Sequence, residues 1–231
     1  MELYLDNVYY RYPGSDEYAL KKLNYRFVEG KTYLITGPNG AGKTTLLLVS
    51  SGLLKPVKGD VLLDKVSIYG KIEYRKIFGV LFQNPDLMLF NPTVYDEITY
   101  SIKQINNDLR EIDKEVDKWL KFFELDKSIL DKQVYTLSYG YKKIIALISI
   151  LIYGPKILML DEPHTNLAKK YFNKIKEVIS INAKNSGINI IASHSTSIYK
   201  DIADYIIMLN NGSIIKSKKA KVIQKGSEYS N

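Results

Sequence analysis

The feature that most constrains this chain is a glycine-rich segment of the form G-x-x-x-x-G-K-[ST] within its first fifth. Glycines at both ends of such a segment let the backbone wrap around a chain of phosphates, with N–H groups and a helix N-terminus facing the negative charge. The lysine then reaches the outer phosphates, and the hydroxyl after it reaches a magnesium ion. The nine residues are Gly37, Pro38, Asn39, Gly40, Ala41, Gly42, Lys43, Thr44 and Thr45.

The residues on either side have the order that a phosphate loop requires. Residues 32–36 are predicted to form a short β-branched strand, and residues 44–51 an apolar helix. Strand, loop and helix therefore follow one another, which a chance glycine-rich turn beside a surface lysine would not explain. We predict that the chain binds a nucleoside triphosphate with Mg²⁺.

A second segment points to the same chemistry. Residues 157–160 form a continuous apolar run, typical of a central parallel strand buried on both faces, and Asp161 and Glu162 follow directly. Carboxylates at that end of a strand face the ligand crevice, so we expect Asp161 to hold Mg²⁺ and Glu162 to orient or deprotonate an attacking water. His194 follows another buried-type run, 188–192, and is expected to donate a hydrogen bond to the terminal phosphate; a purely structural role is the alternative.

Composition excludes several classes of protein. A chain of 231 residues with 45% hydrophobic and 25% charged residues can bury one large α/β core. The longest apolar run, residues 144–153, is shorter than the about 20 residues that span a membrane, and no apolar signal core is visible at the N-terminus. Cysteine is absent, which excludes disulfides and thiolate zinc sites and fits a reducing compartment.

The formal net charge of +8 is compatible with nucleic acid, an anionic membrane surface or no specific partner. The one clear lysine cluster lies near the C-terminus, where we expect a short basic polar tail over residues 218–231. Its members are Lys216, Lys218, Lys219, Lys221 and Lys225.

Strand and helix patterns alternate along the chain, which predicts an α/β fold: a P-loop NTPase cassette with a mainly parallel central sheet. Alternating residues in 3–8 and 23–28 predict an antiparallel N-terminal β region. A helical subdomain over about residues 84–150 is expected to be inserted into this single domain, which covers residues 1–217. Its apolar stripe comprises Leu109, Ile112, Val116, Trp119, Leu120 and Phe123.

The segment 137–140, L-S-Y-G, resembles the L-S-G-G signature of ATP-binding cassette (ABC) proteins. Together with the phosphate loop, Gln83, the acidic pair and His194, the resemblance covers nearly the whole chain. The family implies that ATP is the nucleotide and is hydrolysed, and that Gln83 contacts Mg²⁺ and the attacking water. It also implies that an aromatic residue stacks on adenine; Tyr12 is the candidate and Tyr10 the alternative.

The resemblance further implies a head-to-tail dimer with a second ABC chain, in which Ser138 and the backbone near Gly140 cap the partner's nucleotide. Two departures fall on this surface. Tyr139 and Tyr141 stand where the family prefers glycine and glutamine, and Ala168 stands where it has aspartate. A positive φ at position 139 would strain a tyrosine. We therefore favour a heterodimer with unequal sites over a homodimer.

Residues 82–90, F-Q-N-P-D-L-M-L-F, are followed by P-T-V and resemble a loop of cobalt-type and energy-coupling-factor import ATPases, with Met88 in place of their glutamine. The resemblance implies that Gln83 to Phe90 contacts a coupling helix of an integral membrane subunit. The alternative is that these apolar residues pack inside the helical subdomain.

The sequence thus predicts an ATP-hydrolysing subunit on the cytoplasmic side of the cell membrane, energising import of a vitamin or metal ion. The alternative is a soluble ABC ATPase for a task such as iron–sulfur cluster assembly. We expect no nucleic-acid partner, because the interval between phosphate loop and signature leaves no room for the long coiled coil of DNA-repair cassettes.

Overall fold

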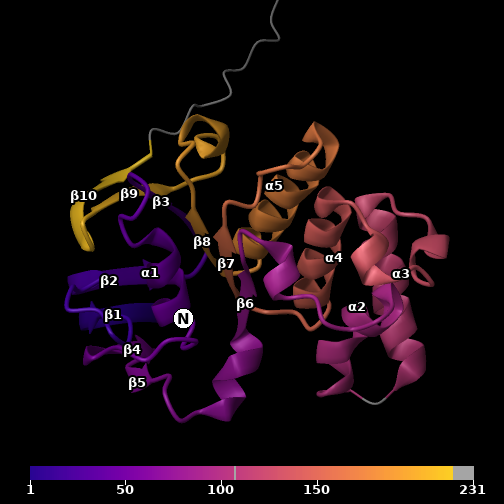
Figure 1. Cartoon of the computed structure of the whole chain (residues 1–231), viewed down its shortest axis with the longest axis horizontal. Coiled ribbons are helices and arrows are strands. Elements are labelled where there is room, and N and C mark those ends of the chain that lie inside the picture. Colours follow the sequence, from indigo (N-terminus) through magenta and orange to yellow (C-terminus); the bar gives the residue numbers. More distant parts are fainter. Residues whose placement is uncertain (107, 221–231) are drawn as a thin grey trace, which may run out of the picture.

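The computed structural model describes residues 1–106 and 108–220. Its strands form two sheets, and the helices pack around the larger one (Figure 1). The chain therefore adopts the predicted α/β architecture. No helix in those two ranges is both long and apolar enough to cross a membrane.

The smaller sheet is antiparallel, with the strand order β2-β1-β4-β5. It contains the two strands predicted for the N-terminal region, and the first of them buries alternate residues over its first half. The strands are β1 (Glu2–Tyr10), β2 (Leu20–Val28), β4 (Lys58–Leu63) and β5 (Val66–Ser67).

The larger sheet has the order β10-β9-β3-β8-β7-β6 and is parallel except for the hairpin strand β10. The two runs predicted as buried strands form β7 and β8, and the strand predicted before the phosphate loop forms β3. The strands are β3 (Lys31–Thr36), β6 (Phe78–Leu81), β7 (Ile157–Asp161), β8 (Ile188–Ala192), β9 (Tyr205–Asn210) and β10 (Ser213–Lys219).

Strand β10 is longer than the sequence pattern predicted. It pairs with β9 as far as Lys219, so Lys218 and Lys219 belong to a strand and not to a polar tail. Main-chain pairing with β9 accounts for the extension. The rest of the predicted tail, from residue 221 onward, lies outside the described residues.

Five α-helices and several short 3-10 helices connect the strands in the described ranges. Helices α2, α3 and α4 lie between β6 and β7 in the chain, within the segment predicted to be helical. They are α1 (Lys43–Ser50), α2 (Val94–Lys103), α3 (Leu109–Phe123), α4 (Tyr139–Leu151) and α5 (Lys169–Lys184), with the 3-10 helices η1 (Ile72–Ile77), η2 (Pro85–Leu87), η3 (Lys127–Ile129), η4 (Val134–Thr136) and η5 (Ser197–Tyr199).

The apolar stripe of α3 is buried as predicted, except at its start and at Trp119, which is partly buried against the core. Ile112, Val116, Leu120 and Phe123 are buried, whereas Leu109 is 58% exposed. Leu109 is the first helical residue, so no preceding turn covers it. The side chain of Asp108 caps this end by accepting hydrogen bonds from two backbone N–H groups of the first turn.

Two hydrophobic cores lie on opposite faces of the larger sheet. Consecutive residues of β7 alternate between them, as the pleat of a strand requires: Leu158 belongs to one core and Met159 to the other. The core of Met159 includes α1 and the smaller sheet, and the core of Leu158 includes α2, α4 and α5 (Figure 1). Burial on both faces explains why the central strands are continuous apolar runs.

The parallel register brings three strand ends to one level. Ala192 at the end of β8 pairs with Asp161 at the end of β7 and with Ile35 near the end of β3. The phosphate loop, the acidic pair and His194 each follow one of these ends. Side chains far apart in the sequence therefore meet at one edge of the sheet.

Candidate functional site

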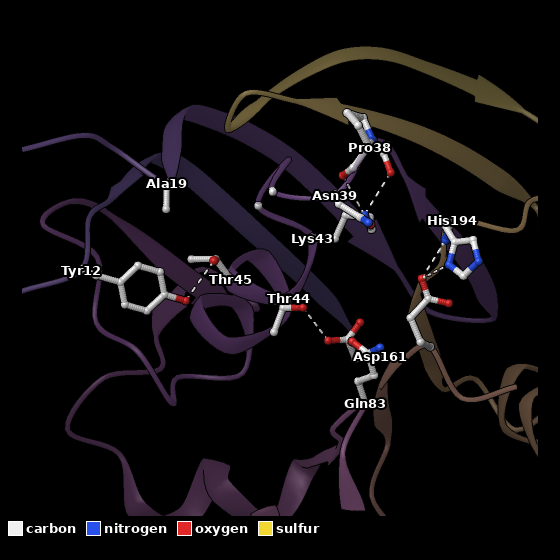
Figure 2. Close-up of a pocket in the computed structure, with 14 residues that line it drawn as sticks. Tyr12, Ala19, Pro38, Asn39, Lys43, Thr44, Thr45, Gln83, Asp161 and His194 are labelled. Carbon is white, nitrogen blue, oxygen red and sulfur yellow. Dashed lines mark hydrogen bonds and ion pairs between the residues drawn. The ribbon is translucent and has the colours of Figure 1, made fainter. Parts of the chain in front are cut away.

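A cleft of about 740 Å³ opens at this edge (Figure 2). Every residue predicted to serve the chain's own nucleotide lines it except Ala41, which is 3% exposed. Ala19 also lines the cleft and was not predicted. The lining residues are Tyr12, Ala19, Gly37, Pro38, Asn39, Gly40, Gly42, Lys43, Thr44, Thr45, Gln83, Asp161, Glu162 and His194.

The phosphate loop needs glycine where it passes close to other backbone. Gly37 has a φ of 150°, and a Cβ there would lie 2.0 Å from the carbonyl oxygen of Leu209 on β9. The ammonium of Lys43 donates hydrogen bonds of 2.9 Å to the carbonyls of Gly37 and Pro38. The positive charge is thus held over the loop, where an anion would meet it (Figure 2).

Oxygen atoms gather at the base of the cleft. The Thr44 hydroxyl donates a 2.5 Å hydrogen bond to the carboxylate of Asp161, and Gln83 lines the same space (Figure 2). Burial raises the pKa of Asp161, although the hydrogen bond from Thr44 and the charge of Lys43 oppose this. Hydroxyl, carboxylate and amide oxygens are ligands that suit Mg²⁺, so the donor set fits that ion.

The carboxylate of Glu162 is fixed by groups at the end of β8. It accepts hydrogen bonds from the Ser193 hydroxyl at 3.1 Å and from the backbone N–H of His194 at 2.8 Å, and it lies 2.7 Å from Nδ1 of the same histidine. Glu162 itself is only 6% exposed. Its carboxylate and the imidazole of His194 therefore face the cleft as one unit.

The backbone of Glu162 lies in the left-handed region, with a φ of 43°. Such a conformation costs a non-glycine residue about 1–3 kcal/mol and persists where neighbours enforce it. Lys143 of α4 supplies the support: its ammonium donates to the Glu162 carbonyl at 3.1 Å, to the Thr165 carbonyl at 3.1 Å and to the Thr165 hydroxyl at 2.7 Å. Burial lowers the pKa of Lys143 to about 8, although the carboxylates of Asp161 and Glu162 oppose this.

Lys143 was not among the residues predicted for the site. The only sign of its role in the sequence is its place directly before a long apolar run in the helix that follows the signature. A lysine in such a place is fully buried, as Lys143 is, only when other groups pair with its charge.

The signature tyrosine contacts the loop that carries Gln83. Tyr139 is the first residue of α4 and has no positive φ, so the strain considered for this position does not arise. Its hydroxyl donates a 2.8 Å hydrogen bond to the Gln83 carbonyl, and Lys142 forms a 2.7 Å ion pair with Asp86. The start of α4 is thus tied to the segment after β6.

Two other predicted residues lie elsewhere. Ser138 and Gly140 do not line the cleft, and the Ser138 side chain makes no capping hydrogen bond at the start of α4.

Of the two tyrosines considered for stacking on adenine, Tyr12 lines the cleft; it is 42% exposed, with its hydroxyl 3.0 Å from that of Thr45. The alternative, Tyr10, is 6% exposed and outside the cleft.

His164 is a further residue near the site that sequence reasoning passed over. It lies in the loop after β7, with Nδ1 3.6 Å from the Glu162 carboxylate and 3.2 Å from the Tyr199 hydroxyl. Burial lowers the pKa of His164, while the charge of Glu162 opposes this. Both histidines of the chain therefore lie beside Glu162.

Comparison with known proteins places the chain in a family. The ABC transporter family model matches residues 20–165. The chain is 33% identical over 225 residues to the energy-coupling factor transporter ATP-binding protein EcfA of Methanocaldococcus jannaschii, a match covering 94% of this chain and 78% of that protein. The chain therefore belongs to the ABC transporter family, as one of its ATP-binding chains.

Two solved structures support the same family assignment. cbiO1 from Clostridium perfringens, part of the ABC transporter complex cbiONQ, matches with a TM-score of 0.80 and 32% identity, covering 95% of this chain and 88% of that one. A dimeric ATP-binding cassette in a post-hydrolysis state, bound to ADP and Pi, matches with a TM-score of 0.83 and 26% identity, covering 95% and 99%.

Replacing Lys143 with methionine should destabilise the chain through the Glu162 turn. The substitution keeps the apolar stem but leaves the Thr165 carbonyl without its donor and the Glu162 carbonyl with only the hydroxyl and backbone N–H of Thr165, at a cost of about 1–3 kcal/mol in the free energy of unfolding. Urea denaturation measures this. Lys114→Met, at an exposed position of α3, is the matched control and should change stability by no more than about 0.5 kcal/mol. Equal effects of the two substitutions would contradict a supporting role for Lys143.

Proposed function

We propose that this chain hydrolyses ATP and thereby energises import of a vitamin or metal ion through a membrane partner. The observation that carries the proposal is the convergence of Lys43, Thr44, Asp161, Glu162 and His194 on one cleft. Relatives described as an energy-coupling factor ATP-binding protein and as part of the complex cbiONQ support the transport role.

Each side chain has a task in this proposal. Lys43 binds the outer phosphates, and Thr44, Asp161 and Gln83 hold Mg²⁺, which neutralises charge on the transferring phosphoryl group. Glu162 aligns a water for in-line attack, and His194 donates a hydrogen bond to the terminal phosphate. Tyr12 stacks on adenine from the exposed rim of the cleft, a contact worth about 1–3 kcal/mol.

Chemistry needs a second cassette, because the signature of this chain lies outside its own cleft. We propose that Ser138 and the backbone near Gly140 serve the nucleotide of a partner, in a head-to-tail dimer. The matched dimeric cassette with ADP and Pi supports that arrangement. Tyr139, Tyr141 and Ala168 depart from the family pattern on this surface, which favours a heterodimer with unequal sites.

The membrane partner is proposed to dock beside the segment Gln83 to Phe90, on the cytoplasmic side. Leu87 is 72% exposed and Phe90 67%, whereas Met88 and Leu89 pack against the core, so the two sequence-based alternatives each hold for part of the loop. Phe90 stands edge-to-face against Tyr100, and Tyr100 lines a groove of about 610 Å³ between η1 and α2. An exposed apolar surface next to a groove suits a short helix of another protein.

Glu162→Gln should stop turnover while ATP binding persists. The amide keeps the size of the side chain but cannot accept a proton, and loss of a general base costs about 10²–10⁴ in rate. Phosphate release and binding of a fluorescent ATP analogue measure the two properties. Glu177→Gln, at a half-exposed position of α5, is the control. Turnover at the parent rate in Glu162→Gln would remove this residue from its role.

The isolated chain should hydrolyse ATP slowly if its proper partner is a different cassette. A missing transition-state donor costs about 10²–10³ in rate, so turnover should be at least about a hundredfold below that of the chain purified with its native partner. Phosphate release measured against protein concentration tests this. A homodimer in which both sites fire cooperatively would contradict the unequal-site heterodimer.

Phe90→Asp should abolish association with the membrane subunit and leave the chain folded. A charge at this exposed position opposes burial in an apolar interface but disturbs no core contact. Co-sedimentation with native membranes measures association, and circular dichroism checks folding. Ile215→Asp, at a 57% exposed position on β10, is the matched control and should still sediment. Retained association of Phe90→Asp would place the docking surface elsewhere.

A further inference from the structure

Three potential metal ligands meet at one side of the cleft, whose lining includes Glu162 and His194. The carboxylate of Glu162 lies 2.7 Å from Nδ1 of His194 and 3.6 Å from Nδ1 of His164, and the two imidazole centroids are 5.8 Å apart. One ligand atom from each residue lies within 4.8 Å of the other two. The ligands lie in the segments that directly follow two adjacent strands, β7 and β8, so the sheet brings these segments together.

We propose that Glu162, His164 and His194 bind a divalent transition metal ion. Two imidazoles and one carboxylate suit Zn²⁺, Co²⁺ or Ni²⁺, whereas Mg²⁺ prefers oxygen ligands. A four-coordinate ion with bonds of about 2.0–2.1 Å needs ligand atoms about 3.3 Å apart. The His194 side chain is 58% exposed, so its imidazole is free to rotate. Such a rotation can bring the three ligand atoms, now within 4.8 Å of one another, to the spacing that the ion needs.

The surroundings resemble those of metal ligands. The Ser193 hydroxyl, which is buried, donates to the Glu162 carboxylate at 3.1 Å. The Tyr199 hydroxyl, on a fully buried side chain, lies 3.2 Å from Nδ1 of His164, so coordination through this nitrogen would replace that contact. The rings of Phe172 and Tyr199 stand edge-on to that imidazole and restrict its movement. Outer groups of this kind orient metal ligands and strengthen binding.

The site is separate from the one that would hold Mg²⁺, because that site uses Thr44 and Asp161. Its consequence rests on the proposed function: an ion held by Glu162 and His194 occupies the groups proposed to align water and to contact the terminal phosphate. Binding of the transition metal would therefore inhibit hydrolysis. By linkage, any loss of metal affinity caused by ATP equals the loss of ATP affinity caused by the metal.

The composition of the chain makes metal binding through histidine easy to assign to this cluster. It has two histidines and no cysteine, so any binding through imidazole nitrogen involves this cluster. The chain, ¹⁵N-labelled at histidine and freed of any polyhistidine tag, is titrated with ZnCl₂ without nucleotide, and the imidazole ¹H–¹⁵N signals are followed. Both histidines should shift together and saturate at one Zn²⁺ per chain. A shift of His194 alone, or of neither, would overturn the site.

A variant gives an independent readout. His164→Gln should weaken Zn²⁺ binding at least about tenfold, measured in competition with a chromophoric chelator. Loss of a group that only orients a metal ligand lowers metal affinity by about 10–100-fold, and loss of the ligand itself should lower the affinity at least as much. Asp201→Asn, which removes an exposed carboxylate elsewhere, should leave the affinity unchanged. Equal affinity of His164→Gln and the parent chain would contradict the proposal. Since these measurements use no nucleotide, their outcome is independent of whether the chain hydrolyses ATP.

Discussion

The register of three parallel strands is the constraint on which the candidate site depends. β3, β8 and β7 pair so that Ile35, Ala192 and Asp161 lie side by side, and the phosphate loop, His194 and Glu162 follow these positions. Apolar side chains packed on both faces lock that register, because a slip of one residue would exchange the two faces of a strand. The geometry of the cleft is thus set by packing that lies well away from it.

The direction of the Glu162 carboxylate depends on a second contact, between the sheet and α4. The left-handed backbone at Glu162 is held by its N–H on the Ala192 carbonyl and by Lys143 on its own carbonyl. The helix that carries Lys143 also begins at the signature and touches the Gln83 loop through Tyr139. A displacement of α4 would therefore move the acidic pair and the Gln83 loop together. The end of the helix that we propose to face a partner chain is thus physically connected to the cleft.

The sequence predicted the parts of this structure that local pattern determines. The phosphate loop, the continuous apolar strands and the amphipathic α3 follow from residue spacing, and the residues after each strand could be assigned to one edge of the sheet from the sequence pattern alone. Lys143, His164 and the Tyr139–Gln83 contact could not be found in this way. Each depends on a tertiary approach between distant segments, and a buried lysine or a loop histidine carries no spacing that identifies its partner. The extension of β10 likewise depends on pairing with β9, which overrides the polar composition of its residues.

The most direct measurement is a crystal structure of the Glu162→Gln chain with ATP and Mg²⁺. We expect the Lys43 ammonium to leave the carbonyls of Gly37 and Pro38 and bind the outer phosphates, with Mg²⁺ at Thr44 and adenine on Tyr12. ATP bound at a different surface, or with its phosphates away from Lys43, would contradict the assignment of this cleft as the nucleotide site.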